Sequence, residues 1–153
     1  MWPLSHVVAG LLAVDLMQYA TGSSALFCQE ILIVVSALLP DVLDKALYWS
    51  RLCHATRSFG HCILFILAWS LLGGTLFGQQ VGWILFASSS SHLLVDLFFG
   101  YVPLLYPIQS FRYPSMIHTK TSKQQLKTIE AVALMYLVLV LGPRLLNFIK
   151  TRF

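Results

Sequence analysis

Residues Ser58 to Val95 have the sequence SFGHCILFILAWSLLGGTLFGQQVGWILFASSSSHLLV, which contains no Asp, Glu, Lys or Arg. An uncharged apolar run of this length is typical of membrane-spanning helices, which need about 20 residues each. Gly78 interrupts the run near its middle, where a glycine favours a turn. The stretch therefore predicts two helices joined by a short connection, at Phe59–Phe77 and Val81–Gly100.

Three further apolar segments flank this pair along the chain. They are Leu4–Ala20, Ser24–Leu39 and Ile129–Phe148. Gly22, Pro40 and Gly142 stand at their ends, and such residues interrupt helices. The second segment has about 16 residues, short for a full crossing, so a tilted or re-entrant course stays open for it. We predict an all-α fold, a single domain over residues 1–153 that forms an integral membrane bundle of about five transmembrane helices.

The composition excludes an ordinary soluble domain. Hydrophobic residues make up 58% of the chain and charged residues 10%, whereas a soluble domain carries about 25% charged residues. Three cysteines without a paired spacing argue against a disulfide framework. The chain has no phosphate-binding glycine loop and no nucleic-acid module. Membrane lipids are therefore the expected partners, and no nucleic acid binding is expected.

The basic residues predict an orientation, because short cytoplasmic loops of membrane proteins are enriched in Lys and Arg. The loops after the second and fourth predicted helices hold seven of them, and three lie from Arg144 to the C-terminus. We therefore expect these two loops and the N-terminus on the cytoplasmic side. The seven residues are Lys45, Arg51, Arg57, Arg112, Lys120, Lys123 and Lys127.

Six ionisable side chains are expected near one end of this bundle. Ionisable residues within a membrane are energetically costly, so they mark candidate functional sites. His92 and Asp96 are four residues apart and so project from one face of a helix. Imidazole nitrogen combined with carboxylate oxygen suits zinc, manganese or iron. A hydrogen-bonded pair that joins helices is the alternative for His92 and Asp96. The six residues are His6, Asp41, Asp44, His61, His92 and Asp96.

Other polar residues are not expected in this group. Asp15 lies nine positions after His6, on the opposite side of the helix and several turns deeper. Cys53 and His54 have no second Cys-His pair that would complete a metal site. We therefore expect Asp15, Cys53 and His54 to lie outside the site.

Five short motifs contain the six residues in a fixed order. They are Ser5-His6, Leu39-Pro40-Asp41-Val42-Leu43-Asp44, Arg57-Ser58-Phe59-Gly60-His61, His92-Leu93-Leu94-Val95-Asp96 and Tyr106-Pro107. With them the chain resembles the membrane-bound metal-dependent hydrolases of bacteria and archaea, the LexA-binding, inner membrane-associated hydrolases of the YdjM type. The order is also similar to that of the zinc-dependent phospholipase C superfamily, and this likeness implies hydrolysis of a phosphoester. The chain departs from the family pattern at Asp44, Thr56 and Gly60.

Together these arguments predict a metal-dependent hydrolase of the bacterial or archaeal inner membrane. Its active site is expected at the cytoplasmic membrane interface and its substrate is a phosphoester or a lipid headgroup. Asp44 is the expected base, and Arg57 is the expected clamp for developing negative charge. The divalent metal is zinc by preference, with manganese or iron as alternatives. Its expected ligands are His6, Asp41, His61, His92 and Asp96.

Two other functions stay open on the sequence. The first is a non-enzymatic membrane protein whose His and Asp cluster serves helix association or partner binding, which the departures from the family pattern favour. The second is an ion or proton pathway, which needs polar groups through the whole membrane thickness. The third and fifth predicted helices offer none at mid-depth, so this second alternative is the weaker one.

Overall fold

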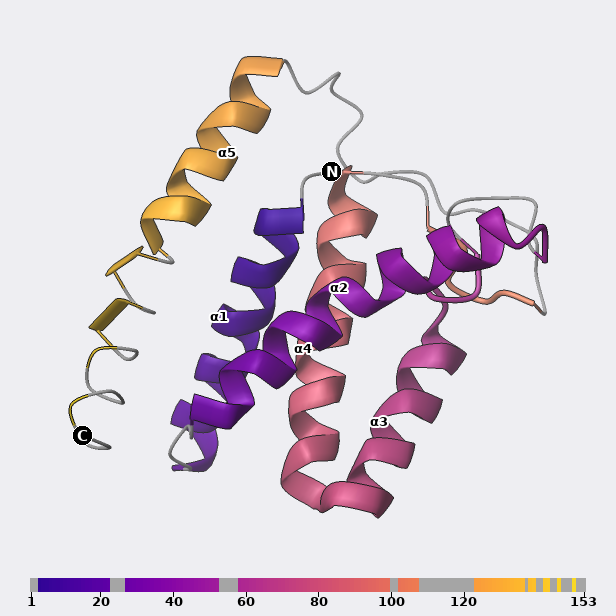
Figure 1. Cartoon of the computed structure of the whole chain (residues 1–153), viewed down its shortest axis with the longest axis horizontal. Coiled ribbons are helices and arrows are strands. Elements are labelled where there is room, and N and C mark those ends of the chain that lie inside the picture. The colour runs from indigo at the N-terminus through magenta and orange to yellow at the C-terminus, as the bar shows by residue number, and fades with distance from the viewer. Residues whose placement is uncertain are drawn as a thin grey trace.

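The computed structural model describes residues 3–22, 27–52, 58–99, 102–107 and 123–136, and also 138–139, 142–143, 146 and 150. Within these residues the chain is all-helical, as predicted, with five helices and no strand (Figure 1). The helices are α1 (Pro3–Thr21), α2 (Phe27–Trp49), α3 (Ile63–Phe77), α4 (Gln79–Phe99) and α5 (Lys123–Tyr136).

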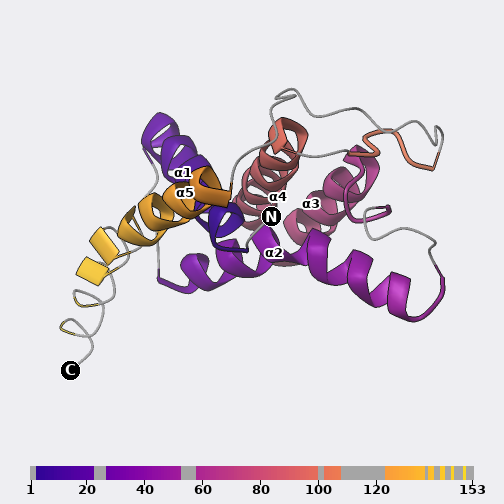
Figure 2. The same ribbon diagram turned by 90° about the horizontal axis from the view of Figure 1, so that it is seen from above.

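Three of the helices, α1, α4 and α3, lie side by side as one layer, and α2 runs obliquely across one face of that layer (Figures 1 and 2). α5 lies beside α1 at the edge of the layer. α3 and α4 form an antiparallel hairpin that turns at Gly78. A Cβ atom at Gly82 would lie 2.9 Å from the Gly74 Cα and from the Ser70 carbonyl oxygen. The close approach of the two hairpin helices therefore requires glycine at position 82.

The main apolar core lies where α1, α2 and α4 meet. Gly10 allows this crossing, because a Cβ atom there would lie 2.8 Å from the Ser88 Oγ and 3.1 Å from the Ala37 Cβ. A smaller apolar cluster of Ile66, Leu93 and Val102 lies along α3 and α4. The buried side chains of the main core are Val7, Leu11, Val14, Ile33 and Ile84.

α2 continues through Pro40 to Trp49, so the predicted helix end at Leu39 is wrong. Proline has no backbone N–H, and the carbonyl of Ser36, four residues earlier, therefore loses its usual donor. The Ser89 hydroxyl of α4 donates to this Ser36 oxygen over 3.4 Å. A side chain from a neighbouring helix thus compensates for the proline.

The remaining predicted boundaries agree to different degrees. α1 and α4 begin and end within two residues of the prediction. α3 begins at Ile63 instead of Phe59, because residues 58–61 form a turn and the Cys62 sulfur accepts the Phe65 backbone N–H as an N-cap. α5 begins at Lys123 instead of Ile129, since Lys and Gln are good helix formers despite their polarity. Most of the predicted helix beyond Tyr136 lies outside the described residues.

The number of membrane-spanning helices is not confirmed. Within the described part of the chain, one helix, α1, is both long and apolar enough to cross a membrane. α3 contains no charged residue but has only 15 residues. The chain is therefore an all-helical protein with one clear candidate span.

Polar and apolar side chains are distributed unlike those of a soluble protein. Among the described residues, thirteen polar or charged and thirteen hydrophobic side chains are buried. Large apolar side chains such as Leu16, Leu71 and Phe77 are exposed on the outside of the helices. Buried polar groups and exposed apolar patches are the exceptions in soluble proteins, and here they are the rule.

Candidate metal centre

Four side chains converge where α2, α4 and the turn before α3 meet. They are Asp41 of α2, His61 of the turn, and His92 and Asp96 of α4. One ligand atom from each lies within 4.8 Å of the others. His61, His92 and Asp96 are fully buried, whereas Asp41 is 24% exposed and forms the open edge of the group.

The distances between these atoms fit a four-coordinate ion. The His61 Nε2 lies 2.9 Å from the Asp96 Oδ2, 3.4 Å from the Asp41 Oδ1 and 3.2 Å from the His92 Nε2. The His92 Nε2 lies 3.5 Å from the Asp96 Oδ2 and 3.9 Å from the Asp41 Oδ1. Bonds of about 2.0–2.2 Å in a tetrahedron separate neighbouring ligand atoms by about 3.3–3.6 Å. The four residues could therefore hold a metal ion.

The other ring nitrogen of each histidine is held by an acceptor. The His61 Nδ1 donates to the Asp44 Oδ2 over 2.7 Å, and the His92 Nδ1 donates to the Ala37 carbonyl oxygen over 2.6 Å. A carbonyl can only accept, so the His92 proton is on Nδ1 and the lone pair on Nε2 faces the centre. Metal-binding histidines in proteins are oriented by this kind of outer hydrogen bond.

The Asp44 carboxylate accepts four hydrogen bonds. The Ser58 N–H and the His61 ring donate to Oδ2, each over 2.7 Å. The Gly60 N–H donates to Oδ1 over 2.7 Å and the Ser58 hydroxyl to the same atom over 3.3 Å. Four donors use all the lone-pair positions of a carboxylate. Asp44, predicted as a base, therefore lies behind His61 and does not point to the centre.

Pro40 explains why two α2 carbonyls face α4. Pro40 has no N–H and its ring crowds the preceding turn, and the carbonyls of Ser36 and Ala37 in that turn accept from Ser89 and His92 of α4. Gly60 packs on the same residue, since a Cβ atom there would lie 2.6 Å from the Pro40 carbonyl oxygen. The segment of α2 around Pro40 therefore contacts both α4 and the turn that contains Gly60.

His6 lies next to the four converging residues and is not one of them. Its ring stacks on that of His92 with centroids 3.9 Å apart and an angle of 23° between the planes. Its Nε2 lies 3.7 Å from the Asp96 Oδ1, the carboxylate oxygen not used by His61. The side chain is buried, and its Nδ1 has no hydrogen-bond partner within the described part of the chain. His6 therefore adds an unsatisfied ring nitrogen beside the centre.

The carboxylates around His61 change its pKa strongly. Burial alone would lower the pKa of this imidazole, but hydrogen bonds with Asp41, Asp44 and Asp96 outweigh burial and raise its pKa to about 10. His61 thus carries a proton near neutral pH when no metal competes for its Nε2. Metal binding has to displace that proton.

The sequence-predicted residues outside this group have different positions. Asp15 accepts a hydrogen bond of 3.1 Å from the Tyr136 hydroxyl of α5 and is not among the converging residues. Arg57, Cys53 and His54 lie outside the described residues. Sequence reasoning missed the Ala37 carbonyl and the Ser58 and Gly60 amides, because backbone groups leave no residue-type signal. Pro40 is the one sequence feature that pointed to the open carbonyls.

Comparison with known proteins links the chain to one family. The model of the family described as YdjM inner membrane protein matches residues 1–149. No curated protein and no solved structure matches the chain.

Proposed function

The chain belongs to the YdjM inner membrane protein family, and from this premise we propose that it is a metal-dependent hydrolase embedded in the inner membrane. The observation that carries the proposal is the convergence of Asp41, His61, His92 and Asp96, with both histidines held by outer acceptors. Three ligands suffice for a hydrolytic centre, and a fourth at an exposed edge can be replaced by substrate. Asp41 is the ligand at that edge.

The distribution of side chains supports an integral membrane bundle. Exposed Leu16, Leu71 and Phe77 find favourable surroundings in acyl chains, whereas the buried histidines and aspartates face one another. The α3–α4 hairpin carries no charged residue from Ile63 to Val95. We therefore propose that the hairpin lies in the membrane together with α1.

The chemistry proposed for the site assigns a role to each residue. When bound, a divalent ion, zinc by preference, supplies a Lewis acid and an acidified water for attack on a phosphoester. Asp44 holds the His61 ring and keeps its Nε2 directed to the ion. His6 keeps an unsatisfied Nδ1 beside the centre, which is free to form a hydrogen bond with a substrate. Arg57 keeps its predicted role as the clamp for anionic charge.

The proposed substrate is a phosphoester, with a lipid headgroup as the first choice. The exposed edge at Asp41 lies at the end of the bundle where α4 ends and α3 begins (Figure 1). A site at the end of a membrane bundle meets the headgroup layer, where phosphoesters are concentrated. The excess of Lys and Arg in the sequence after the second and fourth predicted helices supports a cytoplasmic side for the site.

One observation favours the non-enzymatic alternative. Without metal, a protonated His61 donates to Asp44 through Nδ1 and to Asp96 through Nε2. The cluster is then held together by its own hydrogen bonds and can join α2 to α4 without any ion. Metal content therefore separates the two functions.

Elemental analysis of the purified protein in mild detergent tests the proposal. The wild type and His6→Gln should hold close to one divalent ion per chain, whereas His92→Ala should lose most of it. Asp15→Asn is the matched control, because Asn also accepts the Tyr136 hydroxyl. Trace metal in the wild type, or equal metal in the wild type and His92→Ala, would support the helix-association function instead. Release of product from a phosphodiester by the wild type and not by His92→Ala then tests hydrolysis.

A further inference from the structure

The last turns of α2 extend past the layer of α1, α4 and α3 (Figures 1 and 2). Their inner side holds Pro40 and Asp44, which are buried. Their outer side is exposed, and Val42 and Trp49 are 60% and 77% accessible. This segment therefore presents an apolar and aromatic face away from the protein.

Aromatic and basic residues lie together on that outer face. Lys45, Tyr48 and Trp49 follow one another at positions i, i+3 and i+4 and share one side of the helix. Arg51 and Leu52 come directly after the helix end and are exposed as well. Tyr and Trp prefer the level of lipid headgroups, and Lys and Arg beside them attract anionic lipids.

The oblique course of α2 keeps this face at one end of the bundle. The last turns of α2 lie out to the side of the layer, beyond α3, and in Figure 1 at a level between the start of α3 and the end of α4. That end carries the metal centre, and Lys45 follows Asp41 by about one helical turn, or about 6 Å along the axis. An anion held by Lys45 thus lies next to the exposed ligand.

We propose that the exposed end of α2, from Val42 to Leu52, lies in the headgroup layer and binds anionic phospholipid. The proposal rests on the proposed function only for the placement of the chain in a membrane. Lys45 and Arg51 pair with lipid phosphate, and Tyr48 and Trp49 occupy the boundary between headgroups and acyl chains. The segment sets the depth of the four converging residues and brings lipid phosphate close to Asp41, their exposed edge.

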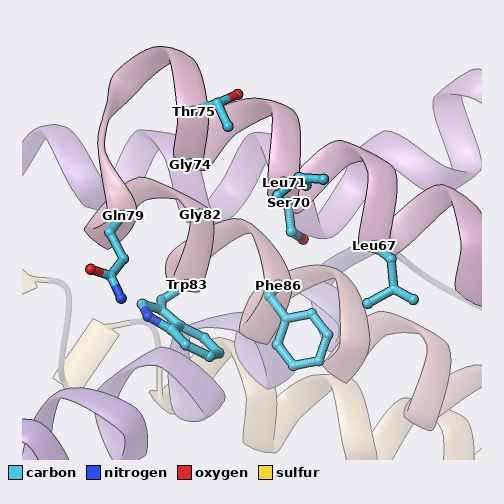
Figure 3. Close-up of a pocket in the computed structure, with 9 residues that line it drawn as sticks. All are labelled: Leu67, Ser70, Leu71, Gly74, Thr75, Gln79, Gly82, Trp83 and Phe86. Carbon is cyan, nitrogen blue, oxygen red and sulfur yellow. The ribbon is translucent and has the colours of Figure 1, made fainter.

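A second apolar feature, the groove between α3 and α4, is not proposed as a site for anionic phospholipid. It has a volume of about 470 Å³, with Leu67 and Leu71 on one wall and Trp83 and Phe86 on the other (Figure 3). Gly74 and Gly82 form its floor, and no cationic side chain lines it. Acyl chains of the surrounding bilayer suffice to fill it.

Fluorescence of single-tryptophan protein in vesicles tests the depth. One protein keeps Trp49, with Trp2, Trp69 and Trp83 replaced by Phe. A matched control has all four tryptophans replaced by Phe and carries Leu71→Trp in the middle of α3. Phosphatidylcholine with bromine near the headgroup should quench Trp49 more than phosphatidylcholine with bromine near the chain end, and the order should be reversed for the control. Stronger quenching of Trp49 by the deep bromines, or no quenching by either lipid, would overturn the proposal.

Lipid preference is measured on the Trp49 protein in phosphatidylcholine vesicles with a minor fraction of brominated lipid. Brominated phosphatidylglycerol should quench about two- to fivefold more than the same fraction of brominated phosphatidylcholine. Lys45→Gln combined with Arg51→Gln should abolish the difference and keep the far-ultraviolet circular dichroism spectrum of the wild type, which shows that the helices are intact. Equal quenching by the two lipids, or a preference that survives the double substitution, would overturn the proposal.

These lipid measurements do not require metal or hydrolysis. A protein without metal that still prefers phosphatidylglycerol would retain this inference and lose the proposed hydrolase function. A protein with metal and no lipid preference would lose this inference alone.

Discussion

Asp44 shows how a single buried carboxylate can determine the geometry of a site that it does not enter. Its four hydrogen bonds join α2 to the turn before α3 and direct the His61 ring. We predict that Asp44→Asn lowers the affinity for metal by about 10- to 100-fold although no ligand is removed. The amide also places an N–H₂ group against backbone donors, which costs about 1–3 kcal/mol of stability. Titration with zinc against a competing chelator measures the affinity.

Asp15→Asn is the control for this substitution, because it makes the same change of charge at a side chain remote from the centre. Its zinc affinity should equal that of the wild type. An affinity of Asp44→Asn within about twofold of the wild type would mean that the orientation of His61 does not depend on Asp44.

His61 links the metal affinity to pH. Burial opposes the charged ring, but the surrounding carboxylates raise its pKa to about 10. Below that pH a metal must displace one proton, so the apparent affinity should rise about tenfold for each pH unit from about 7 to 9. The slope is measured by zinc competition at several pH values, and a flat profile would show that His61 is neutral in the metal-free protein.

The same pKa shift affects the stability of the metal-free fold. A raised pKa means that the folded state binds the proton more tightly than the unfolded state does. The stabilisation from His61 is therefore complete below its unfolded pKa of 6.5 and is lost as the pH rises through about 10.

At the scale of the helix, Pro40 is the feature that connects α2 with the site. It leaves the Ser36 and Ala37 carbonyls open to Ser89 and His92. We predict that Pro40→Ala restores the N–H of position 40, straightens the helix and draws these carbonyls back into it. The zinc affinity should fall about tenfold because His92 loses its anchor.

Calorimetry of the metal-free protein separates this effect from unfolding. Pro40→Ala should leave the thermal stability unchanged or raise it, since alanine is favoured over proline within a helix. A loss of both affinity and stability would show that the proline ring acts through its packing in the fold.

At the scale of the whole molecule, the α3–α4 hairpin and the end of α2 predict opposite accessibility. Ser50 directly follows the end of α2, and Gln80 lies at the start of α4, at the tip of the hairpin. In a chain whose native cysteines are replaced, Ser50→Cys should resist a membrane-impermeant thiol reagent in intact cells and react after permeabilisation. Gln80→Cys should react in intact cells.

Labelling at Ser50→Cys and Gln80→Cys distinguishes a wrong orientation from a hairpin that does not cross the membrane. The reverse labelling pattern would place the centre on the outer side of the membrane. The same behaviour at both positions would mean that the hairpin does not cross.

The sequence alone determined that the chain is helical, membrane-associated and equipped with a cluster of histidines and aspartates. These properties depend on hydropathy and on residue type, which local sequence displays. The bounds of α1 and α4 followed within two residues because turn residues and changes of hydropathy coincide there. The family resemblance relied on the same motifs, and the family match over residues 1–149 confirms membership of the YdjM inner membrane protein family.

Only the tertiary structure decided which of the six residues converge and how they are held. Asp41 and Asp44 are three residues apart, yet one faces the four-residue centre and the other lies behind His61. The continuation of α2 through Pro40 depends on hydroxyl and imidazole donors from α4, residues more than fifty positions away. Proline ends a helix when its freed carbonyls find no partner, and partners from another helix exist only after the chain has folded.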